Sequence, residues 1–409
     1  MADPEPRGTW LPVRWQPDPA ATGPRRARTP ALIEAFVPEP VDAGELSLSA
    51  AATTAAADAE RAIARLQRTH AAGLLRTLSA QMLRSEAIAS SQMEGVVVPS
   101  NRTLAKVGAG GRHHPNAQAA LEAIAAVTDA YAWAAAGGAF TTEILLDLHR
   151  AVARGDRALA PHAGAWREGQ NWIGRDPHTP AGADFVPPPR DHLEPLIDDL
   201  VALLERRDLS PVVQAAVAHA QFETLHPFAD GNGRVGRILV GMLLRRDRLV
   251  EEIDPPVSLV LARDRERYVA ALTAWRLDRR DGPSLLVSTI AEALEEAASA
   301  TARLVDDVDR LLDTWRSTLD GVRAHSAAWA LLELLPSRPI VSATSAAEAL
   351  GRSPQRVRDG LALLQERGVV RPVTLGRRNV QYEAVGVFAL LDAFERELSG
   401  GRLQIAETR

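Results

Sequence analysis

Two apolar stretches joined by a charged, glycine-containing loop most constrain how this 409-residue chain can fold. Residues 212–222 place apolar side chains at roughly helical spacing, which predicts a buried helix. After the loop, apolar residues recur at i, i+3, i+4, i+7 and i+8, as in an amphipathic helix: Val235, Ile238, Leu239, Met242 and Leu243. The segment is therefore expected to be a helix–loop–helix, with its loop at the N-terminus of the second helix.

The loop carries groups that suit an anion. The N-terminus of a helix offers unpaired N–H groups and the positive end of the helix dipole. Gly231 and Gly233 allow the backbone to approach an anion closely and to adopt positive φ. Arg234 and Arg237 lie one helical turn apart, so they can reach one ligand, and a planar guanidinium suits phosphate. The sequence therefore predicts a phosphate site.

Two further side chains add chemistry to this site. His226 is a candidate general base, because the ordinary pKa of histidine lies near neutrality. Asp230 is an oxygen ligand suited to Mg²⁺, which binds one or two carboxylates together with substrate phosphates. A lone histidine would more often cap a helix, and arginines alone would form a solvated face. The full set within twelve residues favours catalysis.

Residues 226–237 resemble, position for position, the signature of the Fic family, HxFx(D/E)GNGRxxR. The resemblance implies a Fic-fold helical core that transfers AMP from ATP to a Ser, Thr or Tyr hydroxyl of a protein target. It implies that His226 deprotonates this hydroxyl and that Asp230 holds Mg²⁺ between the α- and β-phosphates. It also implies that Arg237 binds the γ-phosphate. The residues that the resemblance assigns to nucleotide binding are Gly231, Asn232, Gly233, Arg234, Gly236 and Arg237.

A second motif closes an alanine-rich helical region that begins near residue 48. Gly95 fits a C-terminal helix cap, and Glu94 in the last turn opposes the helix dipole, at a cost of about 0.3–1 kcal/mol. Alone, Glu94 would be an ordinary exposed glutamate. The segment resembles the Fic inhibitory motif, (S/T)xxxE(G/N), with Ser90, Glu94 and Gly95 at the matching positions. The resemblance implies that Glu94 pairs with Arg237 and keeps the γ-phosphate from its productive position.

Two further stretches resemble parts of the family. Apolar residues around a connection rich in Gly and Pro predict a short β-hairpin: Trp172, Ile173, Gly174, Phe185 and Val186. It is similar to the Fic flap, which holds the target by strand-like pairing, and a purely structural hairpin is the alternative. Tyr268 is similar in place to one of two adjacent tyrosines near the adenine in the family, although Val269 departs from the pattern.

The C-terminal part, residues 325–395, resembles a winged helix-turn-helix, a module found appended to many Fic proteins. Its helices are expected at 329–335, at 344–350 and after Ser353-Pro354, and a hairpin wing at 369–382. Five arginines on the expected third helix and wing could bind DNA phosphates: Arg356, Arg358, Arg371, Arg377 and Arg378. The alternative is a domain for homodimerisation or target docking.

Composition limits the partners. A net charge of −5 argues against nucleic-acid binding over the whole surface. The absence of cysteine excludes disulfides and thiolate metal ligands and is compatible with the cytoplasm. No stretch is long and apolar enough to span a membrane, so we expect a cytoplasmic protein with no membrane partner.

The length predicts two or three domains. We expect an extended arm over residues 1–45 and the inhibitory helical region within 1–110, followed by a Fic catalytic domain over 111–320. Its core would cover about 141–295, starting with a helix capped by Thr142. The overall prediction is a mainly α-helical, autoinhibited protein adenylyltransferase with a C-terminal winged helix.

Two other functions stay open from the sequence. The same site could remove AMP from a modified protein, with Glu94 orienting a water. The chain could instead be a DNA-binding regulator whose Fic core senses a nucleotide. His226 and Asp230 favour catalysis over sensing, since a sensor needs neither a base nor a metal ligand.

Overall fold

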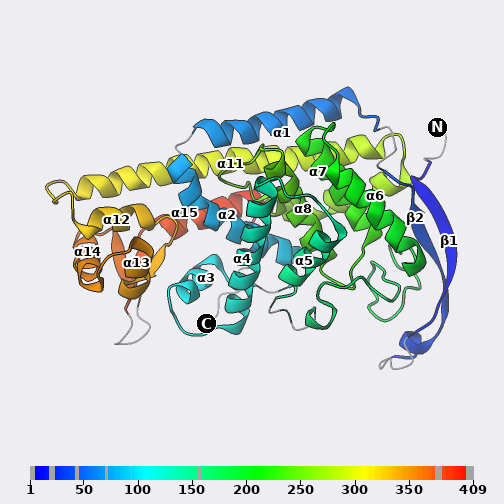
Figure 1. Ribbon diagram of the computed structural model, residues 1–409, viewed down its shortest axis with the longest axis horizontal. Coiled ribbons are helices and arrows are strands. Elements are labelled where there is room, and N and C mark those ends of the chain that lie inside the picture. Colours follow the sequence, from blue (N-terminus) through cyan, green and yellow to red (C-terminus); the bar gives the residue numbers. More distant parts are fainter. Residues whose placement is uncertain are drawn as a thin grey trace. The chain divides into compact units, whose positions relative to one another are not determined.

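The computed structural model describes residues 5–17, 24–41, 46–69, 72–96, 98–154, 156, 159–373 and 380–401. Within these residues the chain is mainly helical, with fifteen α-helices and two small antiparallel sheets (Figure 1). The predicted fold class, a mainly α-helical chain, is therefore confirmed. None of the helices in the described residues is long and apolar enough to cross a lipid bilayer.

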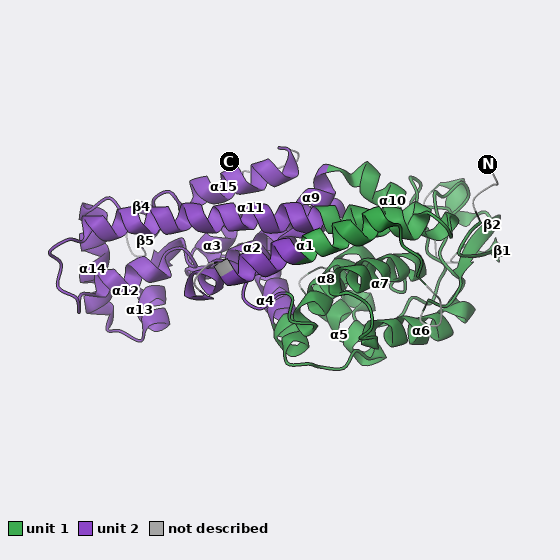
Figure 2. Cartoon of the chain, turned by 90° about the horizontal axis from the view of Figure 1, so that it is seen from above, with its two compact units in different colours: residues 1–60, 129–249, 264–292 green, residues 61–128, 250–263, 293–409 purple. Residues whose placement is uncertain are grey.

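The chain divides into two compact units, which Figure 2 shows in different colours. Unit 1 comprises residues 1–60, 129–249 and 264–292, and unit 2 comprises 61–128, 250–263 and 293–409. Three helices continue from one unit into the other: α1 (Ala50–Thr69), α4 (Pro115–Ala135) and α11 (Gly282–Thr318). The units thus interleave along the sequence, whereas the predicted domains followed one another.

Unit 1 contains the signature loop and the elements that surround it. Besides its parts of the shared helices, it holds β1 (Gly8–Trp15), η1 (Arg25–Arg28), β2 (Ala31–Pro38), α5 (Thr142–Val152), η2 (Ala160–His162), η3 (Arg190–His192), α6 (Leu193–Glu205), α7 (Pro211–Leu225), α8 (Asn232–Arg246) and α10 (Arg265–Leu277).

The N-terminal residues, predicted as an extended arm, form a β-hairpin instead. Strands β1 and β2 pair antiparallel over eight residues, from Gly8 opposite Pro38 to Trp15 opposite Ala31. One face of β2 buries Ile33 and Ala35 in a cluster with Val186. This burial, which no local pattern shows, stabilises strands whose proline and arginine content suggested irregular chain.

Helix α7 is buried along its whole length, from Val212 to Leu225, and not on one face only. It ends where His226 adopts the left-handed conformation, with φ 46° and ψ 58°. Helix α8 begins directly after Gly231, which is also left-handed, with φ 78° and ψ 5°. The predicted helix–loop–helix is therefore confirmed. Farther upstream, the cap of α5 is Thr141, whose hydroxyl accepts from the Ile144 N–H at 3.4 Å, and not Thr142 as predicted.

Unit 2 contains the helix of the inhibitory motif and the C-terminal region. Its remaining elements are α2 (Ala72–Met93), α3 (Asn101–Gly108), α9 (Val257–Arg263), α12 (Ala327–Leu334), β3 (Ile340–Ser342), α13 (Ala343–Leu350), α14 (Pro354–Glu366), β4 (Val370–Val373), β5 (Gln381–Ala384) and α15 (Val387–Ser399). Helix α2 ends at Met93, and Gly95 follows with φ 75°, as expected of a C-terminal cap.

The three helices predicted within 325–395 are present as α12, α13 and α14, and β4 and β5 pair antiparallel. Strand β3, which the sequence did not indicate, adds to β5 and gives the order β3-β5-β4. Arg371 on β4 pairs with buried Glu383 at 2.6 Å. Arg377 and Arg378 lie outside the described residues. The winged-helix assignment stays a prediction.

Candidate functional site

The loop between α7 and α8 brings His226 next to a second titratable side chain. The His226 side chain is 18% exposed, and its Nδ1 lies 3.8 Å from Oε2 of Glu223, one turn earlier on α7. A carboxylate at this place favours a proton on Nδ1, which leaves Nε2 as the basic nitrogen. Glu223 was not predicted from the sequence, although its position three residues before His226 places it in the last turn of α7, close to that histidine.

Asn232 closes the loop through two hydrogen bonds to one residue. The Phe228 N–H donates to Oδ1 of Asn232 at 2.9 Å, and Nδ2 of Asn232 donates to the Phe228 carbonyl at 2.9 Å. Asn232 is 1% exposed, so its side chain shapes the loop. The main-chain N–H groups in the first turn of α8 have no partner within the helix and are the groups available to an anion.

A buried histidine from α5 supports the same loop. The Gly164 N–H donates to Nδ1 of His149 at 3.0 Å, so Nε2 carries the proton and donates to the Asp230 carbonyl at 3.1 Å. The His149 ring stacks on Phe228, with centroids 3.9 Å apart. Burial lowers the pKa of His149, which keeps the ring neutral and suits this pair of bonds.

Two residues that precede the expected flap bind the other carbonyls of the loop. Arg167 donates through Nε to the His226 carbonyl at 2.9 Å and through its main-chain N–H to the Pro227 carbonyl at 2.9 Å. Asn171 Nδ2 donates to the Phe228 carbonyl at 2.7 Å. Burial lowers the pKa of Arg167 to about 10, so the guanidinium stays charged at neutral pH. These contacts fix the main chain that carries His226.

The charged residues of the loop differ in their surroundings. Arg234 is nearly buried, and its Nη1 lies 3.2 Å from Oδ2 of Asp156. Arg237 is 3% exposed. Asp230 is exposed, and its Oδ1 accepts from the Gly231 N–H at 2.5 Å. Among the described residues, no three His, Cys, Asp or Glu side chains are grouped to hold a metal ion. The assignment of Asp230 to a metal ion stays a prediction.

Residues 139–244, which include α5 to α7, the loop and most of α8, match the family model described as the Fic/DOC family. This segment is a Fic/DOC domain.

Two curated relatives and one solved structure are similar to the chain. A probable protein adenylyltransferase of Aquifex aeolicus is 40% identical over 92 residues, which are 22% of this chain and 26% of the relative. Protein adenylyltransferase fic-1 of Caenorhabditis elegans is 32% identical over 128 residues, 31% of this chain and 22% of the relative. The chain thus spans about a quarter of the length of these relatives. A Fic family protein from Desulfovibrio desulfuricans shares the fold, with 23% identity, a TM-score of 0.53, and coverage of 83% of this chain and 98% of that one.

Gly236 serves the packing of the Fic/DOC domain. A Cβ atom at this position would lie 2.7 Å from Oε1 of Glu223 and 3.0 Å from Nδ1 of His219. Helix α8 can therefore approach α7 only because residue 236 has no side chain. The close packing of the two helices explains why residue 236 is a glycine. The assignment of Gly236 to nucleotide binding stays a prediction.

Tyr268 on α10 is buried against α7. Its side chain is 5% exposed, and its hydroxyl lies 2.7 Å from Nε2 of His219. Val269, the residue that departs from the family pattern, is 45% exposed. The adenine contact of Tyr268 stays a prediction, and the bond to His219 is the role that its position supports.

The residues predicted to form the flap are less regular than the predicted hairpin. A single antiparallel bridge joins Ile173 to Phe185, with N–H to carbonyl distances of 2.8 and 3.0 Å. Trp172 contacts Trp15 of β1 edge to face, with centroids 5.9 Å apart. The Val186 carbonyl accepts from the Phe36 N–H of β2 at 2.9 Å. Gly174 lies beside the bridge, where a Cβ atom added to residue 174 would lie 3.0 Å from the Cα of Ala183.

The residues of the inhibitory motif lie in unit 2, whereas Arg237 lies in unit 1. Ser90 is buried within α2, and Glu94 and Gly95 form the turn that follows it. The Gly95 N–H donates to the Gln92 carbonyl at 3.0 Å. The pairing of Glu94 with Arg237 stays a prediction.

Proposed function

We propose that the Fic/DOC domain transfers AMP from ATP to a hydroxyl side chain of a protein target. The observation that carries this proposal is the complete signature loop, held by contacts from His149, Arg167 and Asn171, with His226 beside Glu223. The names of the curated relatives, protein adenylyltransferases, support it.

His226 acts as the general base in this proposal. Its Nε2 takes the proton from the target hydroxyl, whose oxygen forms a bond to the α-phosphorus of ATP as the bond to pyrophosphate breaks. The proton then stays on His226, and the nearby Glu223 carboxylate stabilises the charged ring. A base of this kind contributes about 10²–10⁴-fold in rate.

The phosphates bind at the N-terminus of α8. The main-chain N–H groups of its first turn and the positive helix end attract them, and Arg234 and Arg237 supply charge. Arg234 would exchange Asp156 for a phosphate, and Arg237 is assigned to the γ-phosphate. Mg²⁺, held by Asp230 together with the phosphates, would neutralise charge on the phosphate oxygens.

We further propose that Glu94 inhibits the site by pairing with Arg237. The capped end of α2 at Gly95 supports this, because it gives Glu94 a defined position after the helix. Removal of AMP from a modified protein by the same site is the alternative that the resemblance leaves open.

The test uses labelled ATP and a cell extract, with the Glu94→Gly chain as the active form. We expect His226→Ala in this background to lose labelling of proteins at least 100-fold, in line with the contribution of about 10²–10⁴-fold from a general base, while nucleotide binding survives. His192→Ala, an exposed histidine of the same domain, is the matched control. Labelling by His226→Ala at the control rate would refute the proposal.

Two exposed arginines on α14, Arg356 and Arg358, favour DNA binding as a second function. Charge reversal of both in the full chain should abolish retention of a promoter fragment at low salt. Phosphate contacts should also make binding by the unaltered chain salt-dependent. Arg207→Glu, an exposed arginine of unit 1, is the control. Equal retention by all variants, or retention by none including the unaltered chain, would refute this function and favour a docking domain.

A further inference from the structure

Two polar side chains of α7 converge on Gly236 of α8. A Cβ atom at residue 236 would lie 2.7 Å from Oε1 of Glu223 and 3.0 Å from Nδ1 of His219. Glu223 and His219 are four residues apart on α7, so they lie on one face of the helix, one turn apart. Both side chains are buried. The carboxylate and the imidazole therefore face the same small space beside residue 236.

The other oxygen of Glu223 lies beside the proposed base. Oε2 is 3.8 Å from Nδ1 of His226, so the carboxylate stands between two histidines and has one oxygen toward the Nδ1 of each ring. On the far side of the His219 ring, Nε2 lies 2.7 Å from the Tyr268 hydroxyl. A row of four side chains thus leads from α10 through α7 to the signature loop.

The row has one consistent arrangement of protons. An ionised carboxylate accepts hydrogen bonds and cannot donate them, so it favours a proton on each nitrogen that faces it. For His219 this is Nδ1, and Nε2 then accepts from the Tyr268 O–H. For His226 it is again Nδ1, which leaves Nε2 as the basic nitrogen. The Tyr268 hydroxyl, as a donor, therefore selects the His219 tautomer that suits the carboxylate.

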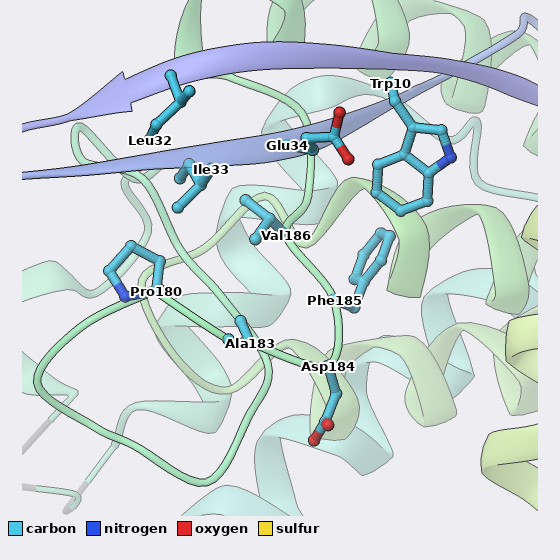
Figure 3. A pocket seen from close by; sticks show the side chains of 10 residues that line it. Trp10, Leu32, Ile33, Glu34, Pro180, Ala183, Asp184, Phe185 and Val186 are labelled. Carbon is cyan, nitrogen blue, oxygen red and sulfur yellow. The ribbon is translucent and has the colours of Figure 1, made fainter.

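A buried cation balances the charge of this carboxylate. Arg276 lies on α10, about two turns after Tyr268. Burial lowers the pKa of Arg276 to about 10, and the negative charge of Glu223 opposes this shift, so the guanidinium is charged at neutral pH. Its Cζ lies 3.9 Å from the ring centroid of Phe185, a residue that also lines the cavity in Figure 3. A buried carboxylate with such a cation nearby stays ionised.

We infer that Tyr268, His219 and Glu223 are positioning residues for the proposed base. Through them, His226 is held with the proton on Nδ1 and with Nε2 unprotonated. The inference rests on the proposed function for the role of His226. It differs from the adenine contact that the family resemblance implies for Tyr268, because it predicts an effect on the rate of AMP transfer and none on the affinity for ATP.

Glu223→Gln separates this row of bonds from an unconnected cluster. An amide has one oxygen and one NH₂ group where the carboxylate has two oxygens. If His219 donates to residue 223, it keeps the amide oxygen as its acceptor, and the NH₂ group is turned toward His226. An N–H at that place favours an unprotonated Nδ1, so the proton of His226 should move to Nε2. Without a donor from His219, the amide oxygen would face His226 and its tautomer would stay the same.

The tautomers are measured by NMR on the full chain labelled with ¹⁵N-histidine, without nucleotide and above the ordinary histidine pKa of about 6.5. The variants His226→Ala and His219→Gln assign the two signals. We expect the proton on Nδ1 of both rings in the unaltered chain, and on Nε2 of His226 in Glu223→Gln. Glu194→Gln, an exposed glutamate of α6, is the matched control and should change neither ring.

AMP transfer is measured in the Glu94→Gly background with labelled ATP and a cell extract. Tyr268→Phe keeps the ring and removes the donor to His219, so we expect the labelling rate at saturating ATP to fall about two- to twelvefold, the contribution of one hydrogen bond. The Kd for ATP, measured by calorimetry, should not change, which also shows that the variant is folded. Glu223→Gln should lower the rate about 10- to 150-fold, as expected for a bond to a charged group. Tyr131→Phe, a buried tyrosine on α4, is the control for both measurements.

A proton on Nε2 of His226 in the unaltered chain, or an unchanged tautomer in Glu223→Gln, would overturn the inference. A weaker Kd for ATP in Tyr268→Phe at an unchanged labelling rate would overturn it in favour of the adenine contact. Either result, together with loss of labelling in His226→Ala, would reject the positioning role and keep the proposed function. The expected tautomers in a chain that transfers no AMP would retain the row of bonds and reject the proposed function.

Discussion

Asn232 offers the sharpest test of how the signature loop is held. In Asn232→Ala the Phe228 N–H, buried in the loop, loses its acceptor, at a cost of about 1–3 kcal/mol. The Phe228 carbonyl also loses one donor, which costs about 0.5–1.5 kcal/mol, although Asn171 still donates to it. We expect the loop to be destabilised by about 1.5–4.5 kcal/mol. Since each 1.4 kcal/mol is a factor of ten, local opening should become about 12- to 1,600-fold more frequent.

Hydrogen exchange followed by mass spectrometry measures this opening on peptides that cover residues 226–235. Asn232→Asp is the informative partner variant, because it keeps an acceptor for the Phe228 N–H and adds negative charge at a helix N-terminus. Its exchange should rise no more than about tenfold, which is the loss of one hydrogen bond. Asn116→Ala, an exposed asparagine on α4, controls for the substitution itself. Exchange in Asn232→Ala that matches this control would refute the reasoning.

Three further outcomes are expected. Glu94→Gly should raise AMP transfer about 30- to 150-fold if the pairing with Arg237 is worth about 2–3 kcal/mol, and equal rates would show that Glu94 does not inhibit. Calorimetry should show that Asp230→Ala loses the Mg²⁺ dependence of ATP binding, and that Arg237→Ala weakens ATP more than ADP; equal losses would contradict the assignment of Arg237. Because burial lowers the pKa of His149 below its unfolded value of about 6.5, the free energy of unfolding should fall as pH drops below that value. In denaturant titrations at several pH values, His149→Gln should make this dependence on pH less steep. An unchanged dependence would show that another group titrates.

Periodicity along the chain was enough to predict the elements that flank the site. Helix α8 repeats apolar residues at helical spacing, the segment before it is apolar enough to form the buried helix α7, and Gly231 marks the break between them. The cap at Gly351 and the start of α14 at Pro354 follow local chemistry in the same way. Local signals of this kind act over a few residues, which is the range that a sequence pattern covers.

Contacts between distant residues could not be predicted. Arg167 donates to the carbonyl of His226, which is 59 residues away in the sequence, and His149 donates to the carbonyl of Asp230, which is 81 residues away. The β1–β2 hairpin was missed for a related reason: Pro12 argues against a strand locally, and the face buried on Val186 becomes visible only in the fold. Such contacts depend on how the whole domain folds, so no local pattern in a single sequence predicts them.

The left-handed backbone of His226 sets folding against chemistry at one position. An L-residue in this conformation is strained by about 1–2 kcal/mol, which glycine would relieve. Selection for thermal stability alone should therefore enrich glycine at residue 226, whereas selection for AMP transfer should retain histidine. The ratio of the two residues in populations evolved under each regime would measure how much stability the chain forgoes to keep the proposed base.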